Sequence, residues 1–463
     1  MNFLLIQPCD PVSNKKDIAS PTTHPPLGLL YVAAALEQNG HKVEIIDFCI
    51  DNIPFEKLMV LVNKSDVVGF TINYINYKSA NQLMTEIKKN DNDVSFITGG
   101  PLCTITQRKI PFFLPSSDIY VCGEGEQVII DIANYYEGKK KLSSIPGIFY
   151  KENDNIKSGK PIEVIKDLDS VPFPARHLVE KYDYGLYPWG YQMKKKVTSM
   201  ITSRGCPFHC RFCTRYNNII KGWGYRQRSA QNVVNEIIEV NKNYRSMFIV
   251  DDNFLENKKR AEKIFDLLIE IDINLDLYIE GARVTSADKE LYLKMKKARV
   301  KMLSFGIESG NKDVLDFYNK KINLNQIRKA IKLSRKMGIT SFGSFILGAP
   351  IETKKHIENT IKFACSLPLD YADFTSLIYM VGSSLWIEAV KDKKISEHEV
   401  RVFADSSRGL GNFTIEELEK YRKLAVKRFF LRPSYILSQV IRGLKQNDAD
   451  LILHGIDFLK FLN

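Results

Sequence analysis

Short apolar runs alternate with amphipathic helical stretches along the first 138 residues. Five of these runs have the composition of buried strands, at residues 2–8, 42–48, 66–72, 94–100 and 118–124. Helical stretches lie between them, such as LGLLYVAAALEQNG at residues 27–40, which ends in a glycine. Strands that alternate with helices at this spacing form parallel sheets. Residues 1–138 are therefore predicted to fold as a doubly wound, Rossmann-like α/β domain.

The alternation returns between residues 196 and 385 with six further apolar runs. They lie at residues 196–205, 246–254, 275–283, 301–309, 339–349 and 370–380. Amphipathic stretches such as SAQNVVNEIIEVNKNY separate them. Because a closed barrel of this type needs eight units, six predict an open, partial (β/α)6 barrel of the TIM type.

Two other segments lack this alternation. Residues 139–195 contain a predicted hairpin followed by a proline-punctuated stretch, and they are interpreted as a linker between the domains. Residues 386–463 are predicted to be helical and are rich in lysine and arginine. A helix that closes the open barrel is favoured there over an amphipathic helix that docks on a membrane surface or an acidic partner.

Composition and charge exclude several classes of protein. The 463 residues are 44% hydrophobic and 26% charged, as in ordinary globular proteins. No apolar run reaches the roughly 18 residues of a membrane span. The N-terminus, MNFLLIQPCDP, is typical of a first strand and not of a signal peptide, so a cytoplasmic location is expected. The net charge is +12, but no arginine-rich tract occurs, so nucleic acid is not an expected partner.

Glycine and polar residues gather at the predicted carboxyl ends of the strands. In the first domain these ends carry Thr71, Gly99–Pro101 and Gly123–Glu126. Doubly wound sheets bind ligands at this edge, and glycine lets the backbone approach a bulky ligand. The same glycines also suit tight βα turns, so both interpretations stay open at this point.

The strands of the barrel end in the same way. Their ends carry Cys206, Asp251–Asn253, Glu280, Arg283, Ser304, Glu308, Ser341, Ser344 and Gly348. In barrels of this type the chemistry takes place at the carboxyl ends of the strands, so a shared site is predicted there. Helix caps and turns account for some of these residues.

Three of the eight cysteines are clustered with the spacing C-x3-C-x2-C, at Cys206, Cys210 and Cys213. In a chain without a signal peptide disulfides are not expected, and the other five cysteines are interpreted as buried residues. Thiolates are ligands for zinc or for an iron–sulfur cluster. A closed zinc site needs a fourth ligand, and His209, inside the loop, is poorly placed to supply one. A [4Fe–4S] cluster on three cysteines leaves one iron open.

The segment GCPFHCRFC at residues 205–213 resembles the motif of the radical S-adenosylmethionine (SAM) superfamily. Residues 280–283 (EGAR) resemble the family's segment beside the methionine part of SAM, and residues 304–310 (SFGIESG) the segment near the ribose. Residues 343–350, with Glu352, resemble the segment beside the adenine. The resemblance implies a [4Fe–4S] cluster on the three cysteines. It implies SAM contacts by Phe212, Glu280, Arg283, Ser304, Glu308, Ser344 and Gly348.

The same resemblance implies the chemistry. The amino and carboxylate groups of SAM chelate the open iron, and one electron from the cluster cleaves the S–C5′ bond. The resulting 5′-deoxyadenosyl radical abstracts a hydrogen from the substrate. The protein positions the cofactor and excludes water and oxygen. An anaerobic enzyme that takes electrons from a donor such as flavodoxin or ferredoxin is therefore expected.

The first domain resembles that of cobalamin (B12)-binding radical SAM enzymes. Residues 24–34 (HPPLGLLYVAA) resemble their PPLGLxYxAA helix start, and the two glycine-rich turns resemble their GGPH and GEGE turns. The resemblance implies cobalamin contacts by Pro26, Leu27, Gly28, Thr71, Gly99, Gly100, Pro101, Gly123, Glu124, Gly125 and Glu126. The D-x-H-x-x-G motif that supplies a lower cobalt ligand is missing, and Cys103 takes the place of the GGPH histidine.

The resemblance favours a methyltransferase that acts on an unactivated carbon or phosphorus centre of a small-molecule or lipid-like substrate. A cobalamin-dependent cyclase, ring contractase or anaerobic oxidoreductase with the same cofactors is the alternative. A tRNA methylthiotransferase is less favoured, because such enzymes carry three cluster cysteines in the N-terminal domain and end in a small β-barrel. A corrinoid sensor or scaffold would predict damage to the cysteine motif, which is intact.

Overall fold

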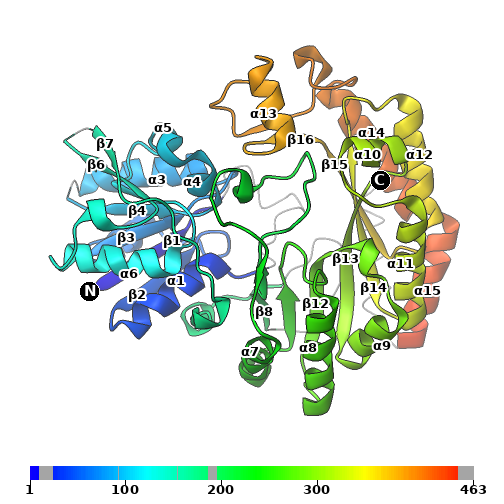
Figure 1. Cartoon of the computed structure of the whole chain (residues 1–463), viewed down its shortest axis with the longest axis horizontal. Coiled ribbons are helices and arrows are strands. Elements are labelled where there is room, and N and C mark those ends of the chain that lie inside the picture. The colour runs from blue at the N-terminus through cyan, green and yellow to red at the C-terminus, as the bar shows by residue number, and fades with distance from the viewer. Residues whose placement is uncertain (10–23, 92, 154, 186–195, 447–463) are drawn as a thin grey trace. The chain divides into compact units, whose positions relative to one another are not determined.

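The computed structural model describes residues 1–9, 24–91, 93–153, 155–185 and 196–446. The chain divides into two compact units (Figure 1). The first comprises Met1–Gly185 with Tyr216–Trp223, and the second comprises Leu186–Arg215 with Gly224–Asn463. None of the helices in the described ranges is both long and apolar enough to cross a membrane.

The first unit contains a seven-stranded sheet in the order β2-β1-β3-β4-β5-β6-β7. Its strands are β1 (Asn2–Gln7), β2 (Lys42–Asp47), β3 (Val67–Thr71), β4 (Phe96–Gly99), β5 (Ile119–Val121), β6 (Ile148–Glu152) and β7 (Asn155–Ser158). The first five strands pair in parallel, and β6 and β7 continue the sheet as an antiparallel hairpin. The predicted doubly wound sheet is confirmed. The hairpin predicted within residues 139–195 is part of this sheet, and residues 186–195 lie outside the described ranges.

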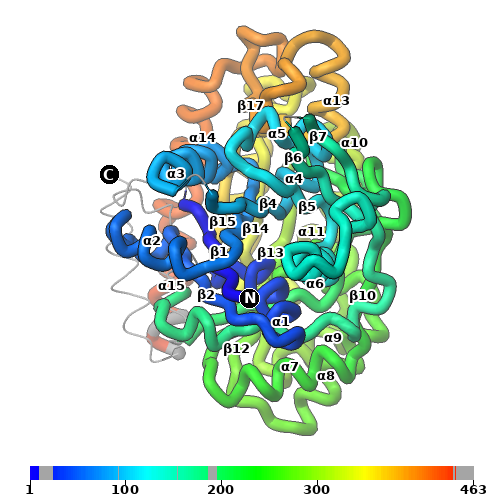
Figure 2. Tube along the Cα trace, turned by 90° about the vertical axis from the view of Figure 1, so that its left-hand side faces the viewer, coloured from blue at the N-terminus to red at the C-terminus, as the bar shows by residue number. Residues whose placement is uncertain are grey.

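Helices cover both faces of this sheet. They are α1 (Leu27–Gln38), α2 (Phe55–Val62), α3 (Tyr77–Asn90), α4 (Pro101–Thr106), α5 (Ile110–Phe113) and α6 (Gly125–Tyr136). Helices α1 and α6 lie side by side on one face, where Leu36 and Ile132 share a core with Phe3 and Ile97 of the sheet (Figure 2). Helices α3, α4 and α5 lie on the other face (Figures 1 and 2). Burial on both faces explains why the central strands β1, β3, β4 and β5 are largely apolar, whereas the edge strand β2 carries the exposed Lys42 and Glu44.

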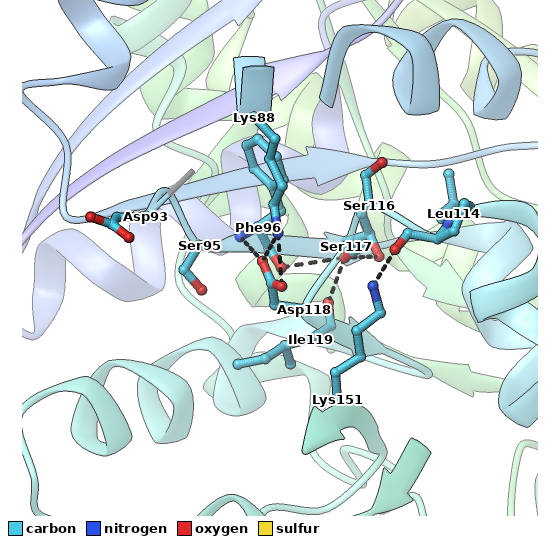
Figure 3. A network of polar contacts seen from close by, with 12 residues as sticks. Lys88, Asp93, Ser95, Phe96, Leu114, Ser116, Ser117, Asp118, Ile119 and Lys151 are labelled. Carbon is cyan, nitrogen blue, oxygen red and sulfur yellow. Dashed lines mark hydrogen bonds and ion pairs between the residues drawn. The ribbon is translucent and has the colours of Figure 1, made fainter. Parts of the chain in front are cut away.

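A polar network ties together the amino ends of β4 and β5 (Figure 3). The carboxylate of Asp118 accepts hydrogen bonds from Lys88 Nζ at 3.0 and 3.1 Å and from the backbone N–H of Phe96 at 2.8 Å. The hydroxyl of Ser117 donates to the carbonyls of Phe96 and Ile119 at 3.3 and 3.2 Å. Ser117 and Asp118 lie directly before β5, and Phe96 and Ile119 are the first residues of β4 and β5. The network therefore stabilises the edge opposite to the one where parallel sheets bind ligands.

The second unit contains six parallel strands in the order β15-β14-β13-β12-β11-β8. They are β8 (Val197–Met200), β11 (Ser246–Ile249), β12 (Asp276–Ala282), β13 (Val300–Glu308), β14 (Thr340–Leu347) and β15 (Tyr371–Ser376). Five of them lie within predicted runs, and β13 begins one residue before its run at 301–309. The first and last strands, β8 and β15, are not paired to each other, so the predicted open barrel is confirmed. A short antiparallel pair, β9 (Ser203–Arg204) and β10 (Arg226–Gln227), flanks the cysteine segment.

The barrel helices are α7 (Ala230–Asn243), α8 (Lys258–Ile271), α9 (Lys289–Lys297), α10 (Lys312–Phe317), α11 (Leu324–Met337) and α12 (Lys354–Ser366) (Figure 1). Local sequence fixes their ends. The side chain of Ser229 caps α7, and Asn323 with Gln326 forms a capping box at α11. Helix α11 stops at Gly338, which has a left-handed φ of +73°.

Helix α14 (Ile415–Phe430) packs along β15, the edge strand of the open barrel. This is the closing role predicted for a helix in residues 386–463. The same region contains α13 (Ser384–Lys391) and α15 (Pro433–Gln446). It also contains β17 (Arg401–Phe403), which pairs with β16 (Ile378–Met380), so it is not helical throughout. Residues 447–463 lie outside the described ranges.

Candidate functional site

The three clustered cysteines lie in the loop that follows β9. The loop begins at Gly205, whose φ is +81°. A Cβ atom at this position would lie 2.8 Å from the carbonyl oxygen of Gly224, so only glycine fits the turn. Cys206 is half-buried, Cys210 is buried and Cys213 is exposed. The loop thus presents three thiols at different depths.

The three thiols are close enough to interact electrostatically. Burial raises the pKa of the Cys206 thiol, and the carboxylate of Asp252 and the thiol of Cys210 raise it further. Among the described residues, no three His, Cys, Asp or Glu side chains converge on a point where one metal ion would sit. In a cubane cluster each thiolate binds its own iron, so the ligands do not need to converge on one point. The donor set fits a [4Fe–4S] cluster better than a single ion.

His209, the remaining candidate ligand in the loop, faces an arginine. Its Nδ1 atom accepts a hydrogen bond from Nη1 of the buried Arg215, and its Nε2 atom lies 3.4 Å from Nη2 of the same guanidinium. A guanidinium has no acceptor, so the imidazole uses its lone pair as the acceptor in this contact. This geometry supports the prediction that the three cysteines are the cluster ligands and that His209 is not one.

A turn after α10 holds the cysteine loop, and the sequence analysis did not find it. The backbone N–H of Arg211 donates to the carbonyl of Tyr318 at 3.0 Å. The rings of Phe212 and Tyr318 meet edge to face, with centroids 5.1 Å apart. The amide of Asn319 donates to the carbonyl of His209 at 2.9 Å. We call Tyr318–Lys321 the clamp turn.

Glu280 and Arg283 are brought to the site by an irregular end of β12. Pairing with β13 shifts register between Ile279 and Ala282, and Gly281 between them has a φ of +68°. Glu280 is half-buried, and burial raises the pKa of its carboxyl group to about 7. The Arg283 guanidinium stacks 3.5 Å from the ring centroid of Phe208, in the cysteine loop.

The Arg283 side chain retains an unused donor. Its Nη2 atom donates to the carbonyl of Lys320 at 2.8 Å. Its Nε–H group is buried and has no hydrogen-bond partner among the described residues. A buried donor without a partner is costly, so this one indicates a place for an acceptor supplied by a ligand. A carboxylate is the acceptor that a guanidinium binds best.

Ser304 and Glu308 come from β13, and Ser344 comes from β14. Half-exposed residues alternate with buried ones in the carboxyl-terminal halves of both strands, which places Ser304, Gly306 and Ser344 on one common face. Glu308 is buried, has a left-handed φ of +66° and forms an ion pair with Lys320, with Oε1 2.5 Å from Nζ. Backbone strain at a non-glycine residue of this kind is typical of functional sites.

Gly348 and Glu352 shape the turn after β14. The φ of Gly348 is +99°. The Oε2 atom of Glu352 accepts hydrogen bonds from the N–H groups of Gly348 and Ala349 at 2.6 and 2.9 Å. Burial raises the pKa of the Glu352 carboxyl group to about 7, although these two hydrogen bonds oppose the shift. The buried Glu352 side chain therefore stabilises the turn through these two hydrogen bonds to its backbone.

Asp251 has a different role from the one that the sequence predicts, and Asp373 is an acidic residue that the sequence does not single out. Asp251 accepts hydrogen bonds from Thr202 N–H at 2.6 Å, Thr202 Oγ1 at 2.5 Å and Ser203 Oγ at 2.6 Å, so it holds the turn between β8 and β9. Asp373 of β15 was not singled out from the sequence. It pairs in register with Ser344, which places it on the common face, and burial raises its pKa while the charge of Arg422 opposes the shift.

In the first unit, the residues at the carboxyl ends of β3, β4 and β5 line one edge of the sheet. Gly100 has a φ of +110°, and a Cβ there would lie 2.7 Å from the carbonyl oxygen of Ile72, so packing requires this glycine. A Cβ at Gly28, at the start of α1, would meet no atom within 4 Å. Packing against the described residues does not require glycine at position 28, and a backbone without a side chain there suits a bulky ligand.

Other residues of the same edge have internal roles. Glu124 is buried, and its Oε2 atom accepts a hydrogen bond from the N–H of Ile165 at 2.7 Å. Cys103 is fully buried and its carbonyl accepts a hydrogen bond from the Cys122 thiol at 3.0 Å. The residue in the place of the GGPH histidine thus points into the core. Cys103 therefore presents no side chain at the surface of this edge.

Comparison with known families covers both units. Residues 18–133 match the B12 binding domain, and residues 200–364 match the radical SAM superfamily. An uncharacterized methyltransferase of Pyrococcus horikoshii is 32% identical over 96% of this chain and 98% of its own length. Cytidylyl-2-hydroxyethylphosphonate methyltransferase of Streptomyces wedmorensis is 26% identical, over 81% of this chain and 79% of its own.

A second reaction type also occurs among the relatives. Anaerobic magnesium-protoporphyrin IX monomethyl ester cyclase of Cereibacter sphaeroides is 28% identical over 76% of this chain and 58% of its own. Among solved structures, the cobalamin-dependent SAM radical enzyme OxsB with aqua-cobalamin and SAM bound has a TM-score of 0.72 and 17% identity. That match covers 99% of this chain and 75% of OxsB, and it confirms the fold. This chain belongs to the radical SAM superfamily and joins a radical SAM domain to an N-terminal B12 binding domain.

Proposed function

We propose that this protein is a cobalamin-dependent radical SAM methyltransferase that acts on an unactivated carbon or phosphorus centre of a small molecule. The observation that carries the proposal is the buried Nε–H of Arg283, which has no hydrogen-bond partner among the described residues and belongs to a guanidinium stacked on the cysteine loop. It offers an anion site beside the three thiols. The similarity to the Pyrococcus horikoshii methyltransferase over nearly the whole chain supports the reaction type.

The predicted cluster and SAM residues each have a chemical task in this proposal. Cys206, Cys210 and Cys213 hold the cluster. The Arg283 guanidinium binds the carboxylate of SAM, and the Glu280 carboxylate binds its ammonium group. Glu308 accepts hydrogen bonds from the ribose hydroxyls. These pairings follow from charge, because a carboxylate and a guanidinium placed near each other match the two ionic groups of an amino acid.

The remaining contacts orient the flat and hydroxylated parts of SAM. Phe212 and Ser304 would contact the ribose and methionine, and Ser344 and Gly348 would border the adenine. In the first unit the glycine-rich strand ends, with Pro26, Leu27 and Thr71, bind cobalamin. When bound, the cluster supplies one electron to SAM and cobalamin supplies the methyl group. Flavodoxin or ferredoxin is the expected source of the electron.

Cofactor loading tests this proposal. The protein is purified without oxygen, reconstituted with iron, sulfide and hydroxocobalamin, and compared with Cys213→Ala prepared in the same way. The proposal predicts a cluster and a corrinoid in the wild type, and 5′-deoxyadenosine after addition of SAM and dithionite. Cys213→Ala is expected to keep the corrinoid and to lose SAM cleavage. A wild-type protein that retains no corrinoid, or a variant that cleaves SAM, would contradict it.

A cobalamin-dependent cyclase is a second candidate, because the Cereibacter sphaeroides relative is a cyclase. The two functions differ in what SAM becomes. A methyltransferase produces S-adenosylhomocysteine as it remethylates the corrinoid, in addition to 5′-deoxyadenosine. A cyclase that uses SAM only as a radical source produces 5′-deoxyadenosine alone.

A further inference from the structure

Lys320 lies at the centre of the clamp turn and has a different environment from its neighbours. The residues on both sides, Asn319 and Lys321, have left-handed φ angles of +53° and +55°. Left-handed conformations are uncommon in residues with a side chain, and two so close together persist only where the surroundings fix them. The Lys320 side chain is only 12% exposed, whereas Lys321 is exposed to solvent. The turn thus directs one of two adjacent lysines into the site.

The ammonium group of Lys320 makes two contacts there. Its Nζ atom lies 2.5 Å from Oε1 of Glu308, whose side chain is 7% exposed. The same atom lies 5.8 Å from the ring centroid of Phe212, the residue before Cys213. A Cβ on Gly306 would lie 2.7 Å from Nζ and 2.5 Å from Oε1. The space for this ion pair therefore exists because position 306 is glycine.

The backbone of Lys320 makes a third connection. Its carbonyl accepts the hydrogen bond from Nη2 of Arg283 at 2.8 Å. One residue therefore contacts three candidate cofactor residues, Glu308, Arg283 and Phe212. An ion pair with little solvent exposure is weak evidence for a role in stability, because desolvation offsets much of the attraction. Its position among these residues indicates a role in the site.

We propose that Lys320 is a cofactor-positioning residue, which holds the Glu308 carboxylate in place for the ribose of SAM. The proposal rests on the SAM site described under Proposed function. Lys320 occupies Oε1 of Glu308, and no hydrogen bond from the described residues reaches Oε2. This second oxygen is then free to accept from the ribose, while the ion pair holds the carboxylate in one orientation. A single charged hydrogen bond at a site with little solvent exposure is worth about ten- to a hundredfold in affinity.

The test uses anaerobic protein with a reconstituted cluster and measures the Kd for SAM by equilibrium binding, the iron content and the Tm. Lys320→Met is expected to weaken SAM binding by about ten- to a hundredfold, with wild-type iron content. Lys320→Arg retains the charge and is expected to recover part of the affinity. Lys321→Met, in the same turn, is the matched control and should bind SAM as the wild type does.

A double variant shows whether Lys320 acts through Glu308. Glu308→Gln with Lys320→Met should bind SAM no more weakly than Glu308→Gln alone, because the two side chains form one unit. If Lys320→Met binds SAM with wild-type affinity, the proposed role of Lys320 is overturned, but the proposed function of the protein is not. Loss of iron or a large drop in Tm in both Lys320→Met and Lys320→Arg would also overturn the proposed role of Lys320, in favour of a structural role. A wild-type protein that carries its cluster and does not bind SAM would overturn the proposed function as well.

Discussion

The guanidinium carbon of Arg283 lies 3.5 Å from the centroid of the Phe208 ring, so the end of the third barrel strand contacts the cysteine loop directly. The contact joins a residue of the predicted SAM site to the segment between two predicted cluster ligands. It also orients the buried Nε–H of Arg283, which has no partner among the described residues. We therefore expect Arg283 to contact both the cysteine loop and bound SAM.

Substitution of Arg283 tests this relationship. Arg283→Met should retain a side chain over Phe208 but remove the charge, and the Kd for SAM should rise by about ten- to a hundredfold. Arg283→Lys should recover little, because an ammonium group lacks the planar fork that stacks and binds a carboxylate. Arg328→Met is the control, since Arg328 stacks 4.8 Å from the ring of Phe363 elsewhere in the same unit. Equal losses in Arg283→Met and Arg328→Met would contradict the assignment.

The raised pKa of Glu280 predicts a pH dependence for SAM binding. Burial raises this pKa to about 7, so the carboxyl group is neutral below that pH and ionised above it. An ionised carboxylate is needed to bind an ammonium group, so affinity for SAM should increase as the pH rises from 6 to 8, about a unit on either side of this pKa. Glu280→Gln should bind weakly and lose most of this dependence. A titration in which the variant keeps the wild-type slope would assign the dependence to another group.

Gly306→Ala is expected to separate folding from cofactor binding. The added Cβ would lie 2.5 Å from Oε1 of Glu308 and 2.7 Å from Nζ of Lys320, both at the ends of side chains that can move. The fold should therefore survive, with a Tm near that of the wild type, while SAM affinity falls. Gly224→Ala is the matched control, because a Cβ there meets no atom within 4 Å. Aggregation or unfolding of Gly306→Ala would show that the glycine serves packing instead.

His209 is predicted to be dispensable for cluster binding. Its ring nitrogens face the guanidinium of Arg215, and the three cysteines suffice for a cluster with one open iron. His209→Ala should therefore retain wild-type iron content after reconstitution, whereas Cys210→Ala should lose it. Iron analysis and the visible absorption of the cluster measure this. Loss of iron in His209→Ala to the level of Cys210→Ala would make the histidine a ligand.

The fold could be predicted from the sequence because most strands of the two parallel sheets are buried on both faces and are therefore apolar. All eleven parallel strands coincide with the apolar runs, and the register of β13 and β14 explains why Ser304 and Ser344 share a face. The antiparallel strand β17 is three residues long and lies within the lysine- and arginine-rich stretch that the sequence predicts to be helical, so that prediction is wrong there. Short edge strands of this kind carry little periodic signal.

Only part of the candidate site could be predicted from the sequence. Glu280 and Arg283 were found because they belong to an ordered motif at a strand end. Tyr318 and Lys320 were missed, because they reach the site from a turn after α10, and nothing in local spacing distinguishes Lys320 from Lys321. Asp251 was placed in the shared site, but three hydrogen bonds commit it to the turn after β8. Such roles are set by tertiary contacts and not by local pattern.

Methyl transfer to the corrinoid tests the central proposal most directly. Reconstituted protein with bound cobalamin is reduced and given SAM that carries a trideuterated methyl group, without any other substrate. The products are analysed by mass spectrometry, with Cys213→Ala and corrinoid-free protein as controls. The proposal predicts trideuterated methylcobalamin and an equal amount of S-adenosylhomocysteine in the cobalamin-loaded protein. Formation of 5′-deoxyadenosine without either of these products would contradict it.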